Sequence, residues 1–297
     1  MASPELDKLV ANLRAANIAG DKSVAELREG WERFAAAFPV ATDVVLEPVN
    51  AGGVPAEWVS TADAVDDRVI LFVHGGGYTI GSIPSYRNFT GNIARAARAN
   101  LLSVGYRLAP ENPFPAALDD AVASYRWLLA TGVDPQRIVM VGDSAGGGLA
   151  LATAVRLRDE GDPLPAAIVT VSASTDLAKE GASITERAEM DPLVNYKSSM
   201  AQGLRYVGSP DKLKDPLASP LYADLHGLPP LLLMVGTHEI LFDDTTRFAD
   251  KASAAGVEVE LDVWEDMIHV WPVFAEMLPE GRYAIDKIGG YVQARVP

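Results

Sequence analysis

Short apolar runs alternate along the chain with longer segments whose apolar residues recur at helical spacing. This alternation limits the fold more than any other feature, because a strand that is apolar throughout must be covered on both faces. A mostly parallel sheet with helices on both sides meets this requirement and places the chain in the α/β class. The predicted strands are residues 69–73, 101–106, 138–141, 168–171, 231–235 and 257–264, preceded by an antiparallel edge of residues 43–48 and 57–60. The predicted helices between them are residues 86–98, 116–130, 147–158, 245–255 and 270–278.

Two regions of the chain depart from this alternation. Residues 1 to about 40 contain two amphipathic helices, 3–16 and 24–37, and residues from about 178 to about 221 contain helical pieces divided by prolines. Neither region offers a strand to the central sheet, so we expect both to form a helical cap over one edge of it. Ordinary outer helices are the alternative. No linker or repeat divides the chain, and residues 1–297 are expected to form a single domain.

Composition and charge exclude several classes of function. The chain has no cysteine, which excludes disulfides, thiolate metal sites and a cysteine nucleophile. Its formal net charge of −15 would repel nucleic acids and anionic membrane surfaces. No secretory signal is visible at the start, and no apolar stretch approaches the roughly 18 residues that a membrane helix needs. We therefore expect a soluble, cytoplasmic protein that binds neither nucleic acid nor membrane.

A nucleophile motif directly follows one of the predicted strands. Residues 142–146 read Gly-Asp-Ser-Ala-Gly, the G-x-S-x-G pattern of a sharp turn between a strand and a helix. The strand 138–141 precedes this turn and the helix 147–158 follows it, as the pattern requires. Ser144 is therefore the predicted nucleophile. Its place at a helix N-terminus favours developing negative charge.

A run of glycines follows the predicted strand 69–73. Residues 74–77 read His-Gly-Gly-Gly, and consecutive glycines let backbone N–H groups approach a substrate, as an oxyanion hole requires. The run lacks the glycine spacing and the lysine of phosphate-binding loops. Gly75 and Gly76, together with Ala145 after the nucleophile, are the predicted oxyanion donors.

A base must remove the proton of the serine hydroxyl. His269 is the predicted base, because it follows the last predicted strand and completes the chain order serine, acid, histidine. Several carboxylates follow the preceding strand and could orient its imidazole. We favour Glu239, which lies nearest the end of that strand. Asp243 is the alternative, although Asp243 and Asp244 are also well placed to cap the next helix.

These motifs resemble those of the bacterial hormone-sensitive-lipase-like carboxylesterases, which have the α/β-hydrolase fold. The resemblance covers about residues 69–270, and its most specific parts are residues 74–78, 106–120 and 142–147. It implies a helical cap, Ser144 as nucleophile, His269 as base, and an acid about thirty positions before the histidine, where this chain has Glu239. The chain departs from the family's usual Asp-Pro-Leu-x-Asp segment there and reads Glu-Ile-Leu-Phe-Asp.

The expected activity is that of a serine carboxylesterase that hydrolyses short acyl esters without a metal or an organic cofactor. The predicted pocket-wall residues are Tyr78, Met190, Leu193 and Tyr196, with ordinary cap packing as the alternative. The mostly apolar cap favours small, rather hydrophobic esters. Similar proteins also open lactones or remove acetyl groups, and a ligand-binding protein on the same fold is a more distant alternative. Family members often form dimers, so the resemblance allows a homodimer.

Overall fold

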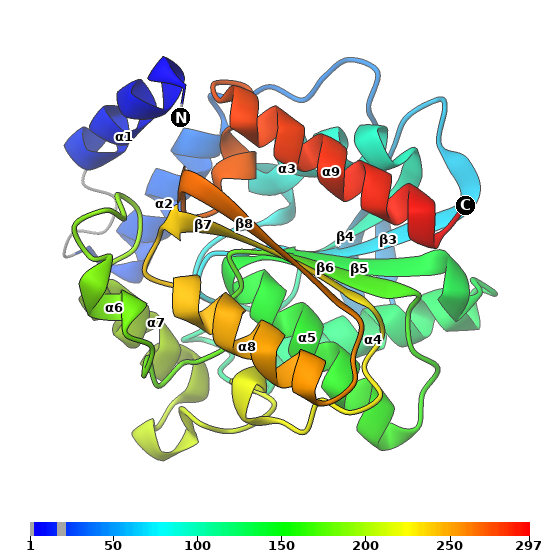
Figure 1. Ribbon diagram of the computed structural model, residues 1–297. Coiled ribbons are helices and arrows are strands. Elements are labelled where there is room, and N and C mark those ends of the chain that lie inside the picture. Colours follow the sequence, from blue (N-terminus) through cyan, green and yellow to red (C-terminus); the bar gives the residue numbers. More distant parts are fainter. Residues whose placement is uncertain (1–2, 17–21) are drawn as a thin grey trace.

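One eight-stranded sheet crosses the middle of the protein in the computed structural model, which describes residues 3–16 and 22–297 (Figure 1). The strands are β1 (Val45–Ala51), β2 (Val54–Ser60), β3 (Val65–Val73), β4 (Ala99–Val104), β5 (Ile138–Asp143), β6 (Ala167–Val171), β7 (Leu231–His238) and β8 (Val259–Ile268). Their order across the sheet is β1-β2-β4-β3-β5-β6-β7-β8. β2 is antiparallel to both of its neighbours, β1 and β4. The other six strands, β4, β3, β5, β6, β7 and β8, are parallel to one another. The predicted α/β class is therefore confirmed.

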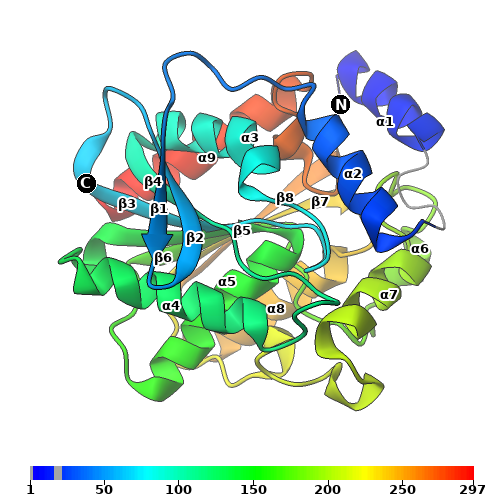
Figure 2. The same ribbon diagram turned by 180° about the vertical axis from the view of Figure 1, so that it is seen from behind.

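Helices cover the sheet on both faces. α3 and α9 pack on one face, and α4, α5 and α8 pack on the other, which gives two apolar cores (Figures 1 and 2). The helices are α1 (Pro4–Ala16), α2 (Val24–Ala35), α3 (Ile83–Ala97), α4 (Ala116–Ala130), α5 (Ser144–Glu160), α6 (Ser183–Glu186), α7 (Tyr196–Val207), α8 (Phe242–Ala254) and α9 (Pro279–Arg295). Short 3-10 turns form at η1 (Pro135–Arg137), η2 (Pro210–Lys212), η3 (Pro220–Tyr222) and η4 (Trp271–Phe274). No helix in the described ranges combines the length and the apolar character that crossing a membrane requires.

The C-terminal part of the chain differs from the sequence prediction. A helix is predicted over residues 270–278, but only the short turn η4 forms there, and the long helix α9 begins later at Pro279. A proline has no N–H to continue a preceding helix but suits the first turn of a new one, so the helix starts afresh. Gly289 lets α9 lie close to α3, since a Cβ at this position would come 2.4 Å from the carbonyl carbon of Ala96.

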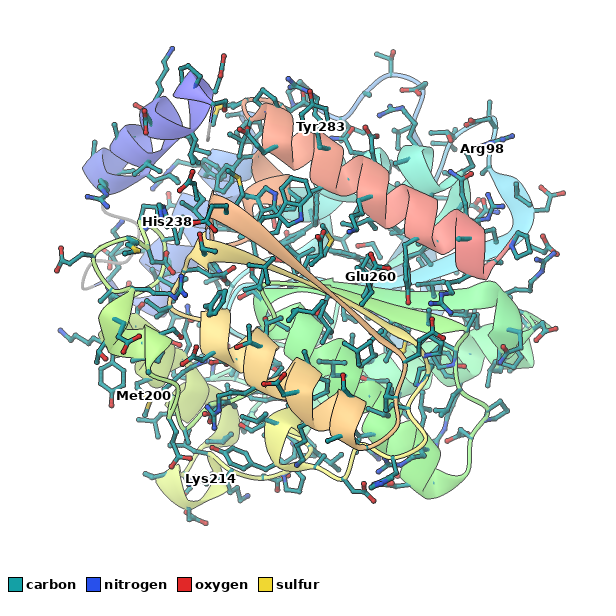
Figure 3. The ribbon with its side chains drawn as sticks, in the orientation of Figure 1. Arg98, Met200, Lys214, His238, Glu260 and Tyr283 are labelled. Carbon is teal, nitrogen blue, oxygen red and sulfur yellow. The ribbon has the colours of Figure 1, made fainter. Side chains whose placement is uncertain are left out.

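The carboxyl ends of the parallel strands meet at one edge of the sheet, where ligands bind in open α/β sheets. His238, the last residue of β7, marks this edge in Figure 3. α1, α2, α6 and α7 gather on the same side of the molecule (Figures 1 and 2). They come from the two regions in which the sequence predicts the cap. Residues 1–2 and 17–21 of that prediction lie outside the described residues.

Candidate active site

Ser144 lies at the sharp turn between β5 and α5. Its φ angle is +51°, in the left-handed region that a serine rarely adopts. The flanking glycines make room for this turn. A Cβ on Gly142 would lie 2.4 Å from the carbonyl oxygen of Gly146, and a Cβ on Gly146 would lie 2.1 Å from that of Val73. Larger residues at either position would push the serine out of place.

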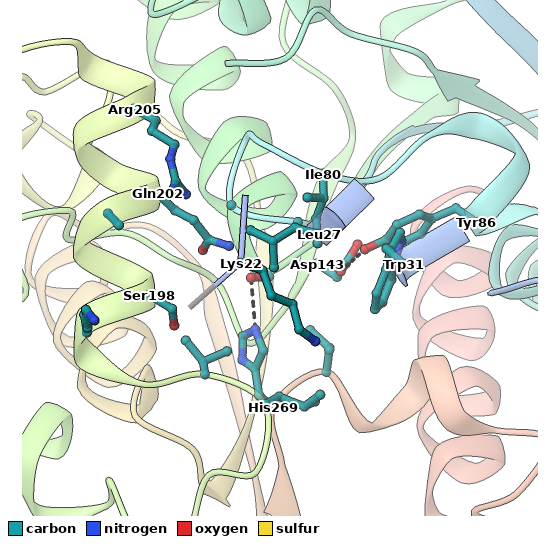
Figure 4. Close-up of a pocket in the computed structure, with 18 of the residues that line it drawn as sticks. Lys22, Leu27, Trp31, Ile80, Tyr86, Asp143, Ser198, Gln202, Arg205 and His269 are labelled. Carbon is teal, nitrogen blue, oxygen red and sulfur yellow. Dashed lines mark hydrogen bonds between the residues drawn. The ribbon is translucent and has the colours of Figure 1, made fainter. Parts of the chain in front are cut away.

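The three side chains predicted to form a catalytic triad lie together at the carboxyl edge of the sheet. His269 Nε2 is 3.0 Å from Ser144 Oγ, the contact drawn as a dashed line in Figure 4, and His269 Nδ1 is 2.7 Å from Glu239 Oε2. Glu239 directly follows β7, and His269 directly follows β8. The carboxylate keeps the proton of the imidazole on Nδ1, which leaves Nε2 free to accept a proton from Ser144.

Glu239 is fully buried, and both of its carboxylate oxygens have partners. While Oε2 faces the histidine, Oε1 accepts hydrogen bonds from Ser172 Oγ at 2.9 Å and from the N–H of Gly236 at 2.8 Å. Ser172 also accepts a hydrogen bond from the N–H of Val270 at 3.0 Å. One hydroxyl therefore ties the acid to the loop that carries the histidine. Sequence reasoning missed Ser172, whose only signal is its place directly after β6.

The other carboxylates of this loop face away from the histidine. Asp243 lies in the first turn of α8, and its Oδ2 accepts a hydrogen bond from the N–H of Ser183 at 3.0 Å. Asp244 Oδ2 accepts hydrogen bonds from the N–H of Thr175 and from Lys179 Nζ. Glu239 is thus the carboxylate of this loop that bonds to the imidazole.

Three carboxylates determine the charge state of His269. Burial works against the protonated imidazole, but the hydrogen bond and charge of Glu239, together with the charges of Asp191 and Asp143, outweigh it. They raise the pKa of His269 above the ordinary value of 6.5.

Asp191 joins the chain between α6 and α7 to the loop that carries the acid. Its Oδ1 accepts hydrogen bonds from the N–H groups of Leu193 and Val194, both at 2.9 Å. Its Oδ2 accepts a hydrogen bond from the N–H of Ile240, the residue after Glu239, at 3.0 Å. Sequence reasoning did not identify Asp191, because nothing in the local sequence shows that this loop reaches the end of β7.

The glycine run after β3 requires one correction to the predicted oxyanion donors. The N–H of Gly75 donates to Asp143 Oδ1 at 2.9 Å and is therefore not available to a substrate. Within the described parts of the chain, the N–H groups of Gly76 and Gly77 donate to no protein acceptor, and both residues line the cavity beside Ser144. The sequence shows three adjacent glycines but not which N–H groups are used inside the protein, so it omitted Gly77.

Asp143 and His74 hold this glycine run in place. Burial raises the pKa of Asp143 to about 6, although hydrogen bonds from Tyr86 and Gly75 favour its charged form. The ring of His74 stacks on Tyr106 with centroids 4.3 Å apart, and its Nδ1 lies 2.7 Å from the carbonyl oxygen of Gly75. Burial also lowers the pKa of His74 to about 4, so this imidazole is neutral at pH 7. These contacts of His74 stabilise the conformation of the glycine run.

A cavity of about 170 Å³ opens beside Ser144 and His269 (Figure 4). Its apolar lining residues are Leu27, Trp31, Ile80, Tyr86, Leu193, Val194, Ala201, Val270 and Phe274. Its polar lining residues besides Ser144 and His269 are Lys22, Asp143, Lys197, Ser198, Gln202 and Arg205. Both regions in which the sequence predicts a cap therefore contribute to the wall.

The four predicted pocket-wall residues have different surroundings. Leu193 lines the cavity, as expected. Tyr78 is buried and lines a separate, smaller cavity of about 20 Å³ that also touches Ser144 and Ala145. Its ring stacks on Tyr206 with centroids 3.6 Å apart.

The prediction that Met190 and Tyr196 belong to the pocket wall is wrong. They are 43% and 53% exposed, and neither lines either of these two cavities. Tyr196 is the first residue of α7, and Ser198 of the same helix faces the cavity. Side chains two positions apart on a helix point in nearly opposite directions, so Tyr196 points outward. Met190 lies in the loop before α7, beside residues of α1.

The geometry and a family comparison agree on the class of this protein. Residues 70–273 match the model of a protein family described as having the alpha/beta hydrolase fold. The mostly parallel sheet of this protein carries Ser144 at a turn between a strand and a helix. Glu239 and His269 follow later strands of the same sheet. The protein is therefore an α/β-hydrolase.

Individual relatives narrow this assignment. A crystal structure of an esterase from the bacterial hormone-sensitive lipase family is 47% identical, covers 100% of both chains and superposes with a TM-score of 0.97. An acetyl-hydrolase of Streptomyces hygroscopicus is 43% identical over 99% of this chain and 97% of its own length. An esterase of Acinetobacter venetianus is 32% identical over 89% of this chain and 87% of its own length. The chain belongs to the bacterial hormone-sensitive-lipase-like family of carboxylic ester hydrolases.

Proposed function

We propose that this protein hydrolyses short acyl esters by forming an acyl-enzyme on Ser144. The observation that carries the proposal is the hydrogen-bonded series from Ser144 Oγ through His269 to the buried carboxylate of Glu239. A serine hydroxyl is a weak nucleophile until a base takes its proton, and this series supplies both the base and the group that orients it.

In the first half of the reaction, Ser144 Oγ attacks the ester carbonyl while His269 Nε2 takes its proton. The N–H groups of Gly76, Gly77 and Ala145 stabilise the negative charge on the carbonyl oxygen, each by about 3 kcal/mol at a site of this kind. His269 then gives the proton to the departing alcohol. The C–O bond to the alcohol breaks, and the acyl group remains on Ser144.

In the second half, water replaces the alcohol. His269 takes a proton from the water, whose oxygen attacks the acyl carbonyl, and the same three N–H groups stabilise the second oxyanion. His269 returns the proton to Ser144 as the carboxylic acid leaves. Both halves use only water and groups of this chain.

We expect a preference for short acyl chains. In this proposal α1, α2 and the region around α6 and α7 act as the cap. Residues of this cap line the cavity beside Ser144 and limit its volume to about 170 Å³. Because a poorly accommodated methylene can cost tenfold or more in specificity, kcat/KM should be highest for acyl chains of about two to four carbons and at least about tenfold lower at ten carbons. A series of 4-nitrophenyl esters from two to twelve carbons tests this. Activity that rises steadily toward twelve carbons would contradict it.

Removal of acetyl groups is the second candidate activity. It is favoured by the similarity to the acetyl-hydrolase. Opening of lactones would use the same three residues. Comparing 4-nitrophenyl acetate with an N-acetyl compound and a seven-membered lactone ranks these activities.

The dependence of activity on pH should reflect the raised pKa of His269. This residue acts as a base only when it is neutral, so kcat/KM should rise with pH through a midpoint above 6.5. Replacing Asp191 by asparagine removes one of the negative charges that favour the protonated imidazole, so it should move this midpoint to lower pH. The measurement is a pH profile of kcat/KM from pH 5 to 9. A flat profile between pH 5 and 8 would contradict the assignment of His269.

A further inference from the structure

A polar face of α7 borders the cavity of the proposed active site. Ser198, Gln202 and Arg205 are spaced by four and three positions, so they lie along one side of the helix, as Figure 4 shows. The adjacent side of the helix is buried, where Tyr206 stacks on Tyr78. This packing fixes the rotation of α7, and Arg205 therefore faces the cavity.

Arg205 differs from every other arginine of the chain. Each of the others donates a hydrogen bond to a carboxylate or to a carbonyl oxygen, as Arg87 does to Glu57. Arg205 makes neither a hydrogen bond nor an ion pair with the described residues, although it is half-buried. A guanidinium has five N–H donors and stays charged, so its partial removal from water without a partner is unfavourable.

Further positive charge surrounds the same cavity. Lys22 enters from the segment before α2 and forms no ion pair with a described residue, and Lys197 of α7 also lines the wall. Among the described residues, the only acidic side chain in the lining is Asp143, whose oxygens accept hydrogen bonds from Gly75 and Tyr86. A protein with a net charge of −15 has therefore concentrated cations beside its proposed nucleophile.

We propose that the preferred substrates of this site are esters that carry a carboxylate, which Arg205 binds with the help of Lys22. This proposal rests on the esterase activity proposed above and specifies its substrate class. The planar guanidinium can donate two parallel N–H bonds to the two carboxylate oxygens. The substrate carboxylate would supply the partner that the protein does not, and the apolar side of the cavity would hold the hydrocarbon part of the ester.

Matched pairs of substrates test this proposal on both sides of the ester bond. On the acyl side, mono(4-nitrophenyl) adipate is compared with 4-nitrophenyl hexanoate. On the alcohol side, 3-(4-acetoxyphenyl)propanoate is compared with 4-propylphenyl acetate. The net charge of the protein disfavours anions in general. A kcat/KM that is about tenfold or more higher for the anionic member of at least one pair would therefore indicate local recognition.

Three variants assign that preference to its residue. In Arg205→Gln the ratio of anionic to neutral kcat/KM should fall by about tenfold, and Arg205→Lys should retain part of it, because the charge remains while the planar fork is lost. Arg33→Gln is the matched control, since Arg33 pairs with Glu29 on the surface of α2 and does not line the cavity. The ratio of anionic to neutral kcat/KM in Arg33→Gln should equal that of the wild type.

The outcomes separate this proposal from the one on which it rests. Equal or slower hydrolysis of the anionic ester in both pairs overturns the carboxylate preference, as does a preference that persists unchanged in Arg205→Gln. Absence of any hydrolysis of the neutral esters by the wild type would instead overturn the proposed esterase activity. A ratio that falls equally in Arg33→Gln would show that overall charge is responsible, which also contradicts a role for Arg205.

Discussion

Replacement of Ser144 by alanine is expected to lower kcat for 4-nitrophenyl butyrate by about 10⁴- to 10⁶-fold. Without the hydroxyl, no acyl-enzyme can form, and His269 has no proton to accept from the protein. The remaining rate would come from substrate binding and from the N–H groups that stabilise the oxyanion. The measurement is steady-state hydrolysis with purified protein at a pH above the pKa of His269.

A second serine serves as the control for this substitution. Ser253 is exposed near the C-terminal end of α8 and lines neither of the two cavities beside Ser144. Ser253→Ala should therefore keep the wild-type kcat, and both variants should unfold at temperatures close to that of the wild type. An active Ser144→Ala protein would contradict the assignment of the nucleophile.

Replacement of Glu239 by glutamine is expected to lower kcat by about 10⁴-fold through the wrong imidazole tautomer. The side-chain oxygen of glutamine can keep the hydrogen bonds from Ser172 and Gly236, which turns its NH₂ group toward His269 Nδ1. Nδ1 must then accept a hydrogen bond, so the proton moves to Nε2. A protonated Nε2 cannot take the proton of Ser144.

Asp243→Asn is the matched control for the acid. Asp243 accepts a hydrogen bond from Ser183 and has no contact with His269, so the substitution should change stability more than kcat. The measurement is kcat and thermal unfolding for both variants. A large loss of kcat in Asp243→Asn, with Glu239→Gln nearly unaffected, would transfer the acid's role to Asp243.

The sheet and the positions of the reactive groups could be predicted because each lies in a local context. The predicted strand before Ser144 is apolar throughout, as expected for a central strand, and the helix after it is regular. In a parallel sheet, residues that follow different strands must meet at one edge, so the chain order alone suggested that Glu239 and His269 lie near Ser144. Helix α9 was missed because it follows a prolyl break and contains three glycines.

The details of the site depend on contacts between distant segments and could not be predicted. Which glycine N–H is free depends on Asp143, the last residue of the neighbouring strand β5, which accepts a hydrogen bond from Gly75. Asp191 reaches the loop of the acid only because the chain folds back between α6 and α7. Whether residues such as Met190 line the cavity beside Ser144 depends on the path of the chain between α6 and α7. A homodimer and a cytoplasmic location stay predictions from the sequence.

The proposed mechanism requires Ser144 to become covalently modified during the reaction. The most direct measurement is the intact mass of the protein after treatment with a fluorophosphonate probe, followed by mapping of the modified peptide. One adduct per chain is expected, located on Ser144, with no adduct in Ser144→Ala. Labelling of a different residue, or labelling that persists in Ser144→Ala, would contradict it.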